Sequence, residues 1–467
     1  MFRDLREFLN ELETSGNLIH FSGELSTEYE VPAAITYVAQ YISKAVVFDK
    51  VKGYDTPVVG NVFSGRKSLS IAFAVKEDRL EETYMTRAKK PVKPRLVSSV
   101  PVQEVVIDKN INIQQTIPVL THHEKDAGPY MTSAITIAKD PETGIRGMGL
   151  HRIQVKDKDT IGIFLGTPPL SNFLAKAERL DKPLDIAIAS GVDPLTFCAA
   201  IFYAPEGIDK FDIAGGFAEA PIDLVKCRSV DIEAPPNAEF ILEGYIIPHL
   251  REKEGPFGES TGYYMTFNNP VGKITTITHR SKPIYHGLMP FTAEEKCLVE
   301  VMLRPYLTKM IREAVPEVRI QGLSLPGMGE VCVVQIDKKK EEDGAKVIDW
   351  LLSHPFSKIG VVTDSDVNIA ELDEVVWAIA TRVRPDKDVV IRPGLPGSMI
   401  DPSTSGLGIT TELSLMVTQT AKVGIDATKP LKELERFQRI DVPAEVKKKV
   451  FIKLQKVFKS CGAHYRA

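Results

Sequence analysis

Glu254-Gly-Pro-Phe-Gly-Glu259, followed directly by Ser260-Thr-Gly-Tyr-Tyr264, is the stretch that decides the interpretation of this 467-residue chain. Two carboxylates stand five positions apart, with two glycines and a proline between them. Proline removes a backbone donor and glycine permits dihedrals that other residues avoid, so the stretch predicts a shaped loop rather than a helix or plain strand. Two carboxylates held close together favour acid–base chemistry, because like charges push their pKa values apart. A solvated acidic turn is the alternative.

The composition is that of an ordinary globular protein. The residues are 43% hydrophobic, and 58 basic against 62 acidic side chains give a net charge of −4, which leaves no electrostatic footprint for nucleic acid. No apolar run approaches the roughly 18 residues that cross a bilayer, and the N-terminus has no signal-peptide core. The five cysteines form no CxxC pair, which suits a reducing compartment. We therefore expect a cytoplasmic protein that binds neither nucleic acid nor membrane.

The pattern of residues changes along the chain. Apolar residues at helical spacing, with a capping glycine, predict an N-terminal helix from Phe2, Leu5, Phe8, Leu9, Leu12 and Gly16. After a Pro- and Lys-rich connector at 88–94, β-branched runs from about 100 to 284 favour a barrel or sandwich. Segments 331–336 and 359–363 predict buried strands around a helix at 345–353, which is a βαβ unit.

The C-terminus predicts an amphipathic helix that begins near Asp441 and Pro443. One apolar stripe faces a lysine-rich side, and the stripe consists of Val446, Val450, Phe451, Leu454, Val457 and Phe458. We expect this helix to dock on a partner subunit, and a membrane-surface helix is the alternative.

Other polar motifs have weaker interpretations. His122-His123 is expected to be structural or substrate-facing, because neighbouring side chains on extended backbone point to opposite faces and rarely share a metal. Asp364-Ser-Asp-Val-Asn368 lacks the later glycine and glutamate of a calcium loop, so it predicts a strand end with Asx turns. Arg152 lies in a strand-like segment and is either a surface residue or a guanidinium placed between the two carboxylates to anchor an anionic substrate.

Several segments occur in an order that is known from one family. They are His123-Glu-Lys-Asp-Ala-Gly-Pro-Tyr130, the strand around Arg152, Ile213-Ala-Gly-Gly216 with Val225-Lys-Cys227, Glu239-Phe-Ile-Leu-Glu-Gly244, the stretch from Glu254 to Tyr264, Trp377-Ala-Ile-Ala-Thr-Arg382 and Ala421-Lys-Val-Gly-Ile-Asp-Ala-Thr428. Together they resemble the UbiD family of non-oxidative decarboxylases, which use prenylated FMN. The resemblance implies an α/β (α+β) fold with a central split β-barrel, flavin-reductase-like domain between α/β regions. The expected parts are an N-terminal region at 1–118, a cofactor domain at 119–296, an oligomerisation domain at 297–440 and a docking helix at 441–467.

The resemblance also implies a catalytic network of Arg152, Glu254 and Glu259. Glu259 aligns with the acid that exchanges a proton with the carbon vacated by CO2. Glu254 and Arg152 align with the pair that supports this acid and lies against the cofactor. Lys422 matches a lysine that contacts the cofactor phosphate. Loss of CO2 from an unsaturated carbon leaves a carbanion, which needs an electron sink and a proton donor. Prenylated FMN is the implied sink, supplied by a flavin prenyltransferase.

The chain departs from the family where a divalent metal is usually bound. The family's ligand offsets, counted from Arg152 and Glu254, fall on Gly147, Leu170 and Lys210. None is an expected ligand, because Gly147 has no side chain, Leu170 is apolar and Lys210 is cationic. We predict that the divalent site is missing, with potassium left open, and hypothesise that Lys210 pairs with a phosphate of the flavin or of the substrate. The alternative is that insertions shift the count and Lys210 is a surface residue.

The leading functional hypothesis is a reversible carboxy-lyase that acts on an aromatic or α,β-unsaturated acid and CO2. A phenylphosphate-carboxylase-like subunit that acts on a phosphorylated aromatic without the flavin is an alternative, motivated by Arg146, Lys156 and Lys210 near Arg152. A non-catalytic scaffold within a carboxylase complex is another, although decay gives no reason to keep the acid network. We expect a homo-oligomer or a complex subunit, with the active site in a cleft between the central and C-terminal regions.

Overall fold

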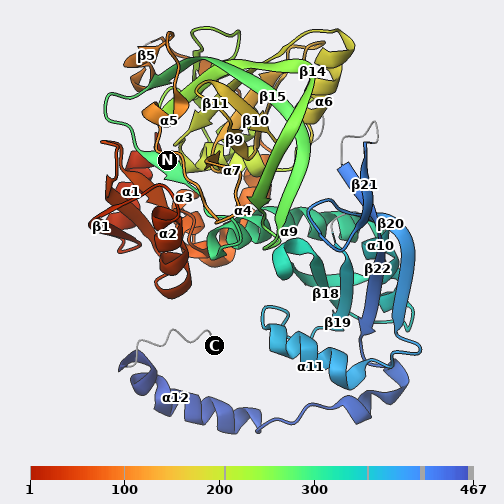
Figure 1. Cartoon of the computed structure of the whole chain (residues 1–467). Coiled ribbons are helices and arrows are strands. Elements are labelled where there is room, and N and C mark those ends of the chain that lie inside the picture. The colour runs from red at the N-terminus through yellow and green to blue at the C-terminus, as the bar shows by residue number, and fades with distance from the viewer. Residues whose placement is uncertain (1, 99, 205–206, 355–356, 411–415, 461–467) are drawn as a thin grey trace.

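The computed structural model describes residues 2–98, 100–204, 207–354, 357–410 and 416–460. It is a mixed α/β fold in which an N-terminal lobe and a large central sheet lie on one side of a long helix, and a C-terminal sheet lies on the other (Figure 1). Among the described helices, none combines the length and the apolar character needed to cross a membrane.

The N-terminal lobe is a four-stranded sheet covered by helices. Along the sheet the strands are β1 (Leu18–Leu25), β2 (Ala45–Val51), β3 (Val58–Gly60) and β16 (Tyr285–Gly287), and the helices are α1 (Leu5–Thr14), α2 (Glu30–Tyr41), α3 (Arg66–Ala72) and α4 (Leu80–Ala88). The predicted N-terminal helix is confirmed by α1, which Asp4 caps by accepting a hydrogen bond of 2.9 Å from the Glu7 amide. Gly16 follows with a φ of 72°, a left-handed conformation that suits glycine at a helix end.

The central sheet has nine strands, most of them antiparallel neighbours. In spatial order they are β6 (Tyr130–Met131), β9 (Ile153–Val155), β10 (Thr160–Ile163), β15 (Tyr264–His279), β14 (Phe240–Gly258), β11 (Leu184–Ser190), β7 (Ile135–Lys139) and β8 (Arg146–Leu150), with β5 (Val105–Ile107) paired to β15. Among the described residues the end strands β6 and β8 do not pair with each other. The split barrel therefore stays a prediction, as do the expected domain boundaries.

Short elements surround this sheet. The helices are α5 (Ile113–Thr116), α6 (Leu170–Arg179), α7 (Pro194–Ile201) and α8 (Lys210–Ala218), and a small separate sheet contains β13 (Glu233–Ala234), β12 (Asp223–Lys226) and β4 (Arg95–Leu96). The cysteines at 198, 227, 297 and 332 are free, and Cys461 lies outside the described residues.

Helix α9 (Ala293–Ala314) joins the central and C-terminal parts of the molecule. Leu298 and Met302, in its first half, belong to the apolar core that also contains α7 and α8. Leu307 and Ile311, in its second half, belong to the core beneath the C-terminal sheet. One helix therefore contributes to two hydrophobic cores.

The C-terminal sheet confirms the predicted βαβ unit. Its strands in order are β17 (Arg319–Ser324), β18 (Val331–Asp337), β19 (Ile359–Asp364), β22 (Met416–Ala427) and β20 (Val389–Ser398), with β21 (Ser405–Thr410) beside β22 and the helices α10 (Asp343–Ser353) and α11 (Leu372–Arg382). β18 and β19 are parallel and α10 connects them. The predicted strand end at Asp364 is also confirmed, because β19 stops there.

The C-terminal helix α12 (Ala444–Ser460) lies within the segment predicted to be helical and extends away from the body (Figure 1). Val446, Val450 and Leu454 of its apolar stripe are exposed. The side chains of Val457 and Phe458 lie outside the described part of the chain. Docking of this helix on a partner stays a prediction.

The prediction of a loop from Glu254 to Glu259 is wrong in part, because residues up to Gly258 belong to strand β14. Pairing with β15 continues through the motif, and its register shifts between Glu254 and Phe257, which is a bulge. Gly255 has a φ of 100°, and a Cβ there would meet the Met265 carbonyl oxygen at 2.5 Å. The glycine and proline therefore accommodate a bulge instead of ending the strand. Arg152, expected inside a strand, lies immediately before β9.

Candidate active site

Arg152 and Glu254 form a buried, two-pronged ion pair. The guanidinium donates from Nε to Glu254 Oε1 at 3.1 Å and from Nη2 to Oε2 at 2.6 Å. Glu254 is 0% exposed, and the amide of Asn269 on β15 donates to its Oε2 at 2.7 Å. A bidentate pair of this kind fixes both the position and the orientation of the arginine.

Glu259 is the second acid on the same arginine. It follows the end of β14, its backbone amide donates to the Tyr263 carbonyl oxygen at 2.9 Å, and its Oε1 forms an ion pair with Arg152 Nη1. The structure thus brings together Arg152, Glu254 and Glu259, the three residues predicted from the sequence. Their catalytic roles stay predictions.

Aromatic rings enclose the arginine. The guanidinium carbon lies 4.6, 5.1 and 5.4 Å from the ring centroids of Phe164, Phe257 and Phe267. These rings keep water from the ion pairs, which strengthens the attraction between the charges. Sequence reasoning missed Phe164, Phe267 and Asn269. A usable signal was present for Asn269, because asparagine is depleted in strands and here occurs within one.

A cavity of about 420 Å³ opens beside this centre. It is lined by Thr132, Leu150, His151, Arg152, Phe164, Thr167, Ile201, Tyr203, Phe257, Glu259, Leu288, Pro290, Glu295, Leu298, Val299, Met302, Leu303 and Ile400. One face of α9 forms a wall, and Ile400 reaches the cavity from the C-terminal part of the chain. The Thr261 hydroxyl donates to the Ile400 carbonyl oxygen at 2.8 Å, which ties the two parts together next to Glu259.

Burial controls the ionisation of the groups around the cavity. Burial, followed by the charge of Lys210, lowers the pKa of His151 to about 4, so this wall residue is neutral at pH 7. Burial raises the pKa of Glu295 to about 7 and raises that of Tyr130, which also lies near Glu254. Desolvation of the charged form is the main cause in each case.

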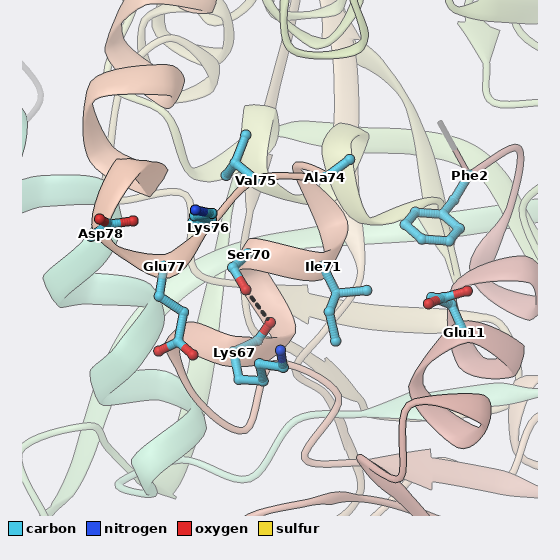
Figure 2. Close-up of a pocket in the computed structure, with 10 residues that line it drawn as sticks. All are labelled: Phe2, Glu11, Lys67, Ser70, Ile71, Ala74, Val75, Lys76, Glu77 and Asp78. Atoms are coloured by element: carbon cyan, nitrogen blue, oxygen red, sulfur yellow. Dashed lines mark hydrogen bonds between the residues drawn. The ribbon is translucent and has the colours of Figure 1, made fainter. Parts of the chain in front are cut away.

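A larger hollow of about 1070 Å³ lies elsewhere, on the N-terminal lobe (Figure 2). Phe2 and the region of α3 line it, and the Ser70 hydroxyl bonds back to the Lys67 carbonyl oxygen at 2.8 Å. Its charged side chains Lys67, Lys76 and Asp78 are exposed. A solvated rim of this kind lacks the converging buried ionisable groups that mark a reaction site, so the smaller cavity is the candidate.

The two lysines predicted to bind cofactor do not line this cavity. Lys422 on β22 is 1% exposed, and its ammonium donates to the His354 carbonyl oxygen. Lys210 begins α8, is 7% exposed, and donates to the Ala200 carbonyl oxygen at 2.8 Å. The alternative that Lys210 is a surface residue is therefore wrong. Cofactor binding by either lysine stays a prediction.

The other cations noted near Arg152 are paired with acids. Arg146 Nη2 lies 2.6 Å from Asp209 Oδ2 and its Nη1 lies 3.0 Å from Glu233 Oε2. Lys156 Nζ lies 2.7 Å from Glu252 Oε2. Their charges are balanced within the protein.

The residues at the family's metal positions do not fit a divalent ion. A Cβ on Gly147 would meet Pro169 Cγ at 2.6 Å and the Phe173 ring at 2.7 Å, so apolar groups fill this space. Leu170 is fully buried in an apolar core. In the part of the chain that the structure describes, no cluster of three His, Cys, Asp or Glu side chains could hold a metal. His122 and His123 have separate contacts, with Thr132 at 3.3 Å and Asp126 at 3.6 Å.

A guanidinium clamped by two acids, beside a mostly apolar cavity, is an arrangement typical of enzymes that act on small molecules. Models of the 3-octaprenyl-4-hydroxybenzoate carboxy-lyase family match three consecutive stretches: its N-terminal domain at 9–88, its Rift-related domain at 95–293 and its C-terminal domain at 296–427. The chain belongs to this family, the UbiD family of carboxy-lyases.

Named relatives are similar over nearly their whole length. The anhydromevalonate phosphate decarboxylase of Methanothermobacter thermautotrophicus is 32% identical, over 93% of this chain and 99% of the relative. The phenolic acid decarboxylase of Sedimentibacter hydroxybenzoicus is 35% identical, over 92% of both chains. The UbiD-class enzyme HmfF from Pelotomaculum thermopropionicum, solved in complex with FMN, superposes with a TM-score of 0.86 at 36% identity, covering 95% of this chain and 98% of HmfF.

Proposed function

We propose that this protein is a reversible, non-oxidative decarboxylase of an aromatic or α,β-unsaturated carboxylic acid. The observation that carries the proposal is the position of Glu259, which lines the cavity while it is held by Arg152. An acid so placed can exchange a proton with a bound substrate, and its partner arginine is itself fixed by Glu254.

In the proposed reaction the bond between the substrate carbon and its carboxylate breaks, CO2 leaves, and the electron pair remains on carbon. Glu259 delivers a proton to that carbon and later regains one from solvent, and the reverse sequence adds CO2. Arg152 orients Glu259, while Glu254 and Asn269 hold the arginine in place.

The cavity beside Arg152 suits a flavin, whereas the residues at the family's metal positions do not suit a divalent ion. HmfF has been solved with FMN and, in an evolved dimeric form, with prFMN. The cavity offers a flat ring apolar walls, among them Leu150, Phe164 and Ile201, with Arg152 as a cation at its edge. When bound, prenylated FMN would supply the electron sink for the electron pair that stays on the substrate carbon when CO2 leaves. We therefore propose prenylated FMN as the cofactor, provided by a flavin prenyltransferase.

The phosphorylated-substrate alternative has one observation in its favour, because a relative is named anhydromevalonate phosphate decarboxylase. Against it, Arg152 is the only arginine or lysine among the residues that line the described cavity, and Arg146 and Lys156 are paired elsewhere. A phosphate on the substrate would need a further cation near the cavity.

The decisive experiment uses the full chain co-expressed with a flavin prenyltransferase. We expect a flavin absorbance spectrum in the purified protein and decarboxylation of at least one acid in a panel such as benzoate, 4-hydroxybenzoate and cinnamate. In D2O the product should carry deuterium at the carbon that lost CO2, detected by mass spectrometry. The matched control is the same protein made without the prenyltransferase. Incorporation of labelled CO2 into a phenylphosphate-derived product by colourless protein would instead establish the alternative.

The exposed stripe of α12 supports a proposal on assembly. An apolar helix face that projects from the body needs a surface to cover it, and a second copy of this chain would supply one. We expect the full chain to elute as an oligomer and a chain ending at 440 to elute as a smaller species in size-exclusion chromatography with light scattering. Identical masses for the two would remove α12 from the interface.

A further inference from the structure

Lys210 is a buried ammonium with no acidic partner among the residues that the structure describes. It is 7% exposed, and the hydrogen bond it donates goes to the neutral carbonyl oxygen of Ala200 at 2.8 Å. Burial lowers its pKa to about 8, and no carboxylate among the described residues offsets that effect. Taking a cation out of water carries a large desolvation cost unless an anion accompanies it.

The adjacent acid, Asp209, already has partners. Asp209 accepts from the Phe211 amide at 2.9 Å and pairs with Arg146 at 2.6 Å. Glu233 pairs with the same arginine at 3.0 Å. Lys139 also lies 3.2 Å from Glu233, so these two acids are shared by two other cations. Lys210 forms no ion pair with an acid in the described part of the chain.

The ammonium lies behind the wall of the active-site cavity. The charge of Lys210 acts on the ring of His151, and His151 lines the cavity. Its acceptor, Ala200, directly precedes Ile201, which is another wall residue. An ammonium has three donors, so Lys210 can keep its bond to Ala200 and still bind an anion that enters from the cavity side.

The alternative source of positive charge is absent from this region. Pro169 and Phe173 occupy the space that a side chain on Gly147 would need, and Leu170 is packed into the apolar core. Oxygen and imidazole ligands that a divalent ion prefers are therefore missing from these positions. Of the three positions, Lys210 is the one that carries a positive charge.

We infer that Lys210 is the residue that pairs with the phosphate of a bound flavin mononucleotide, and that this protein holds its cofactor without a divalent ion. The inference rests on the proposed function for the identity of the anion. It differs from a purely structural role, in which the ammonium only caps the carboxyl end of α7, where Ala200 lies.

The test compares two flavins that differ by the phosphate. Purified full-length protein, stripped of flavin, is titrated with FMN and with riboflavin, and flavin fluorescence gives both dissociation constants in the presence of EDTA. We expect FMN to bind roughly 10- to 100-fold more tightly than riboflavin, as a charge-assisted contact to phosphate implies. In Lys210→Met this preference should disappear while riboflavin affinity stays unchanged, and Lys210→Arg should retain part of it.

The matched control is Lys176→Met, which removes a lysine that already has an acidic partner, Asp140, at 2.7 Å. It should leave the preference for FMN intact. Equal riboflavin binding by the wild type and Lys210→Met shows that the variant is folded.

Three results would overturn the inference. They are an FMN preference that survives in Lys210→Met, loss of FMN binding in EDTA with recovery on adding Mn²⁺, and failure of the wild type to bind FMN at all. The proposed function is judged separately. FMN binding that depends on Lys210, in a protein that decarboxylates no acid, would leave the inference standing and end the proposed reaction, and the converse pair of results would do the reverse.

Discussion

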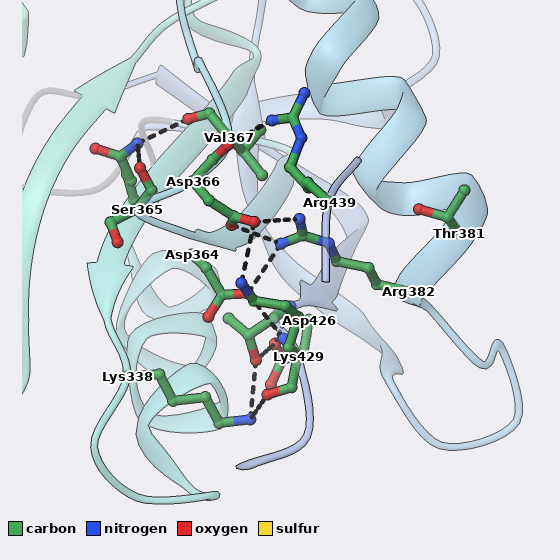
Figure 3. A network of polar contacts seen from close by, with 12 residues as sticks. Lys338, Asp364, Ser365, Asp366, Val367, Thr381, Arg382, Asp426, Lys429 and Arg439 are labelled. Atoms are coloured by element: carbon green, nitrogen blue, oxygen red, sulfur yellow. Dashed lines mark hydrogen bonds and ion pairs between the residues drawn. The ribbon is translucent and has the colours of Figure 1, made fainter. Parts of the chain in front are cut away.

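Two arginines in this molecule each lie between two acids, but the acids of the two clusters have different further contacts. Arg152 lies between Glu254 and Glu259, and Arg382 lies between Asp364 and Asp366 (Figure 3). Each is buried and each contacts aromatic rings, since the Arg382 guanidinium lies 5.0 Å from the Trp377 ring. By charge pattern alone the two clusters are indistinguishable.

Their acids differ in what else they contact. Asp364 also accepts from the Lys429 amide at 2.8 Å, and Asp366 accepts from the Lys429 ammonium at 3.0 Å (Figure 3). This cluster fastens the chain after β22 to the end of β19. The surface hollow of about 550 Å³ beside Arg382 has no carboxylate among its described lining residues, whereas Glu259 lines the cavity next to Arg152. An arginine clamped by acids marks a reaction site only where one of those acids faces space that a substrate can enter.

The largest predicted difference comes from changing one acid to its amide in each cluster. Glu259→Gln should lower turnover by about 10³-fold or more, because the amide cannot deliver a proton, and its melting temperature should stay close to that of the wild type. Asp366→Asn should keep turnover and lose stability. Decarboxylation assays and thermal melts of both variants check this, with Glu252→Gln on the preceding strand β14 as a neutral control. Full activity of Glu259→Gln would refute its assigned role.

Removing Arg382 tests the structural half of the comparison. Arg382→Met leaves two partly buried acids with only the Lys429 ammonium beside Asp366, which should destabilise the protein by about 3 kcal/mol. Arg382→Lys keeps the charge but not the two-pronged geometry and should lose less. Thermal unfolding monitored by circular dichroism measures both variants. If Arg382→Met melted like the wild type, the cluster would not stabilise the C-terminal sheet.

Glu294 extends the comparison to a buried acid that forms no ion pair with an arginine among the described residues. Its Oε1 accepts from the Phe63 amide at 2.7 Å, and burial raises its pKa from 4.5 to about 7. The folded state therefore holds this proton more tightly than the unfolded state, so the stabilisation is complete below pH 4.5 and is lost as pH rises through about 7.

The resulting loss of stability amounts to about 3 kcal/mol at most. Glu294→Gln, which stays neutral, should lose less stability than the wild type between pH 5 and pH 8. Parallel melting curves at the two pH values measure the difference. An equal loss in both proteins would show that Glu294 does not titrate in this range.

The smallest predicted effect concerns the residue that positions Glu254. Asn269→Ala removes the 2.7 Å hydrogen bond to Glu254 Oε2 and should lower kcat by about tenfold with little change in KM, because the arginine pair is loosened but not broken. Asn269→Asp adds a like charge beside Glu254 and should do more harm. Steady-state kinetics separate the two parameters, and a change confined to KM would assign Asn269 to substrate binding.

Sequence reasoning recovered what is encoded locally. The periodicity of α1 and the strand–helix–strand pattern of β18, α10 and β19 were enough to predict those elements. The contact of Arg152 with its two acids was reached through motif and resemblance. The bulge at Gly255 was mistaken for a loop, because pairing with β15 depends on a partner strand that composition does not reveal.

What sequence missed depends on tertiary register. Phe267 meets the ion pair because it lies opposite Glu254 across β14 and β15, and Asn269 is two residues further along the same strand. The sequence also did not show which way the two lysines predicted to bind cofactor would point. Lys422 and Lys210 donate to the carbonyls of His354 and Ala200, which lie 68 and 10 positions away in the chain.

Helix α9 links the shape of the candidate cavity to the orientation of the C-terminal lobe. Its first half supplies the cavity wall through Leu298 and Met302, and its second half is anchored in the C-terminal core through Leu307 and Ile311. Pro305 lies between the halves and removes one backbone hydrogen bond there. A tilt of the C-terminal lobe would therefore move the cavity wall. The room left for substrate then depends on the orientation of a lobe that contributes none of Arg152, Glu254 and Glu259.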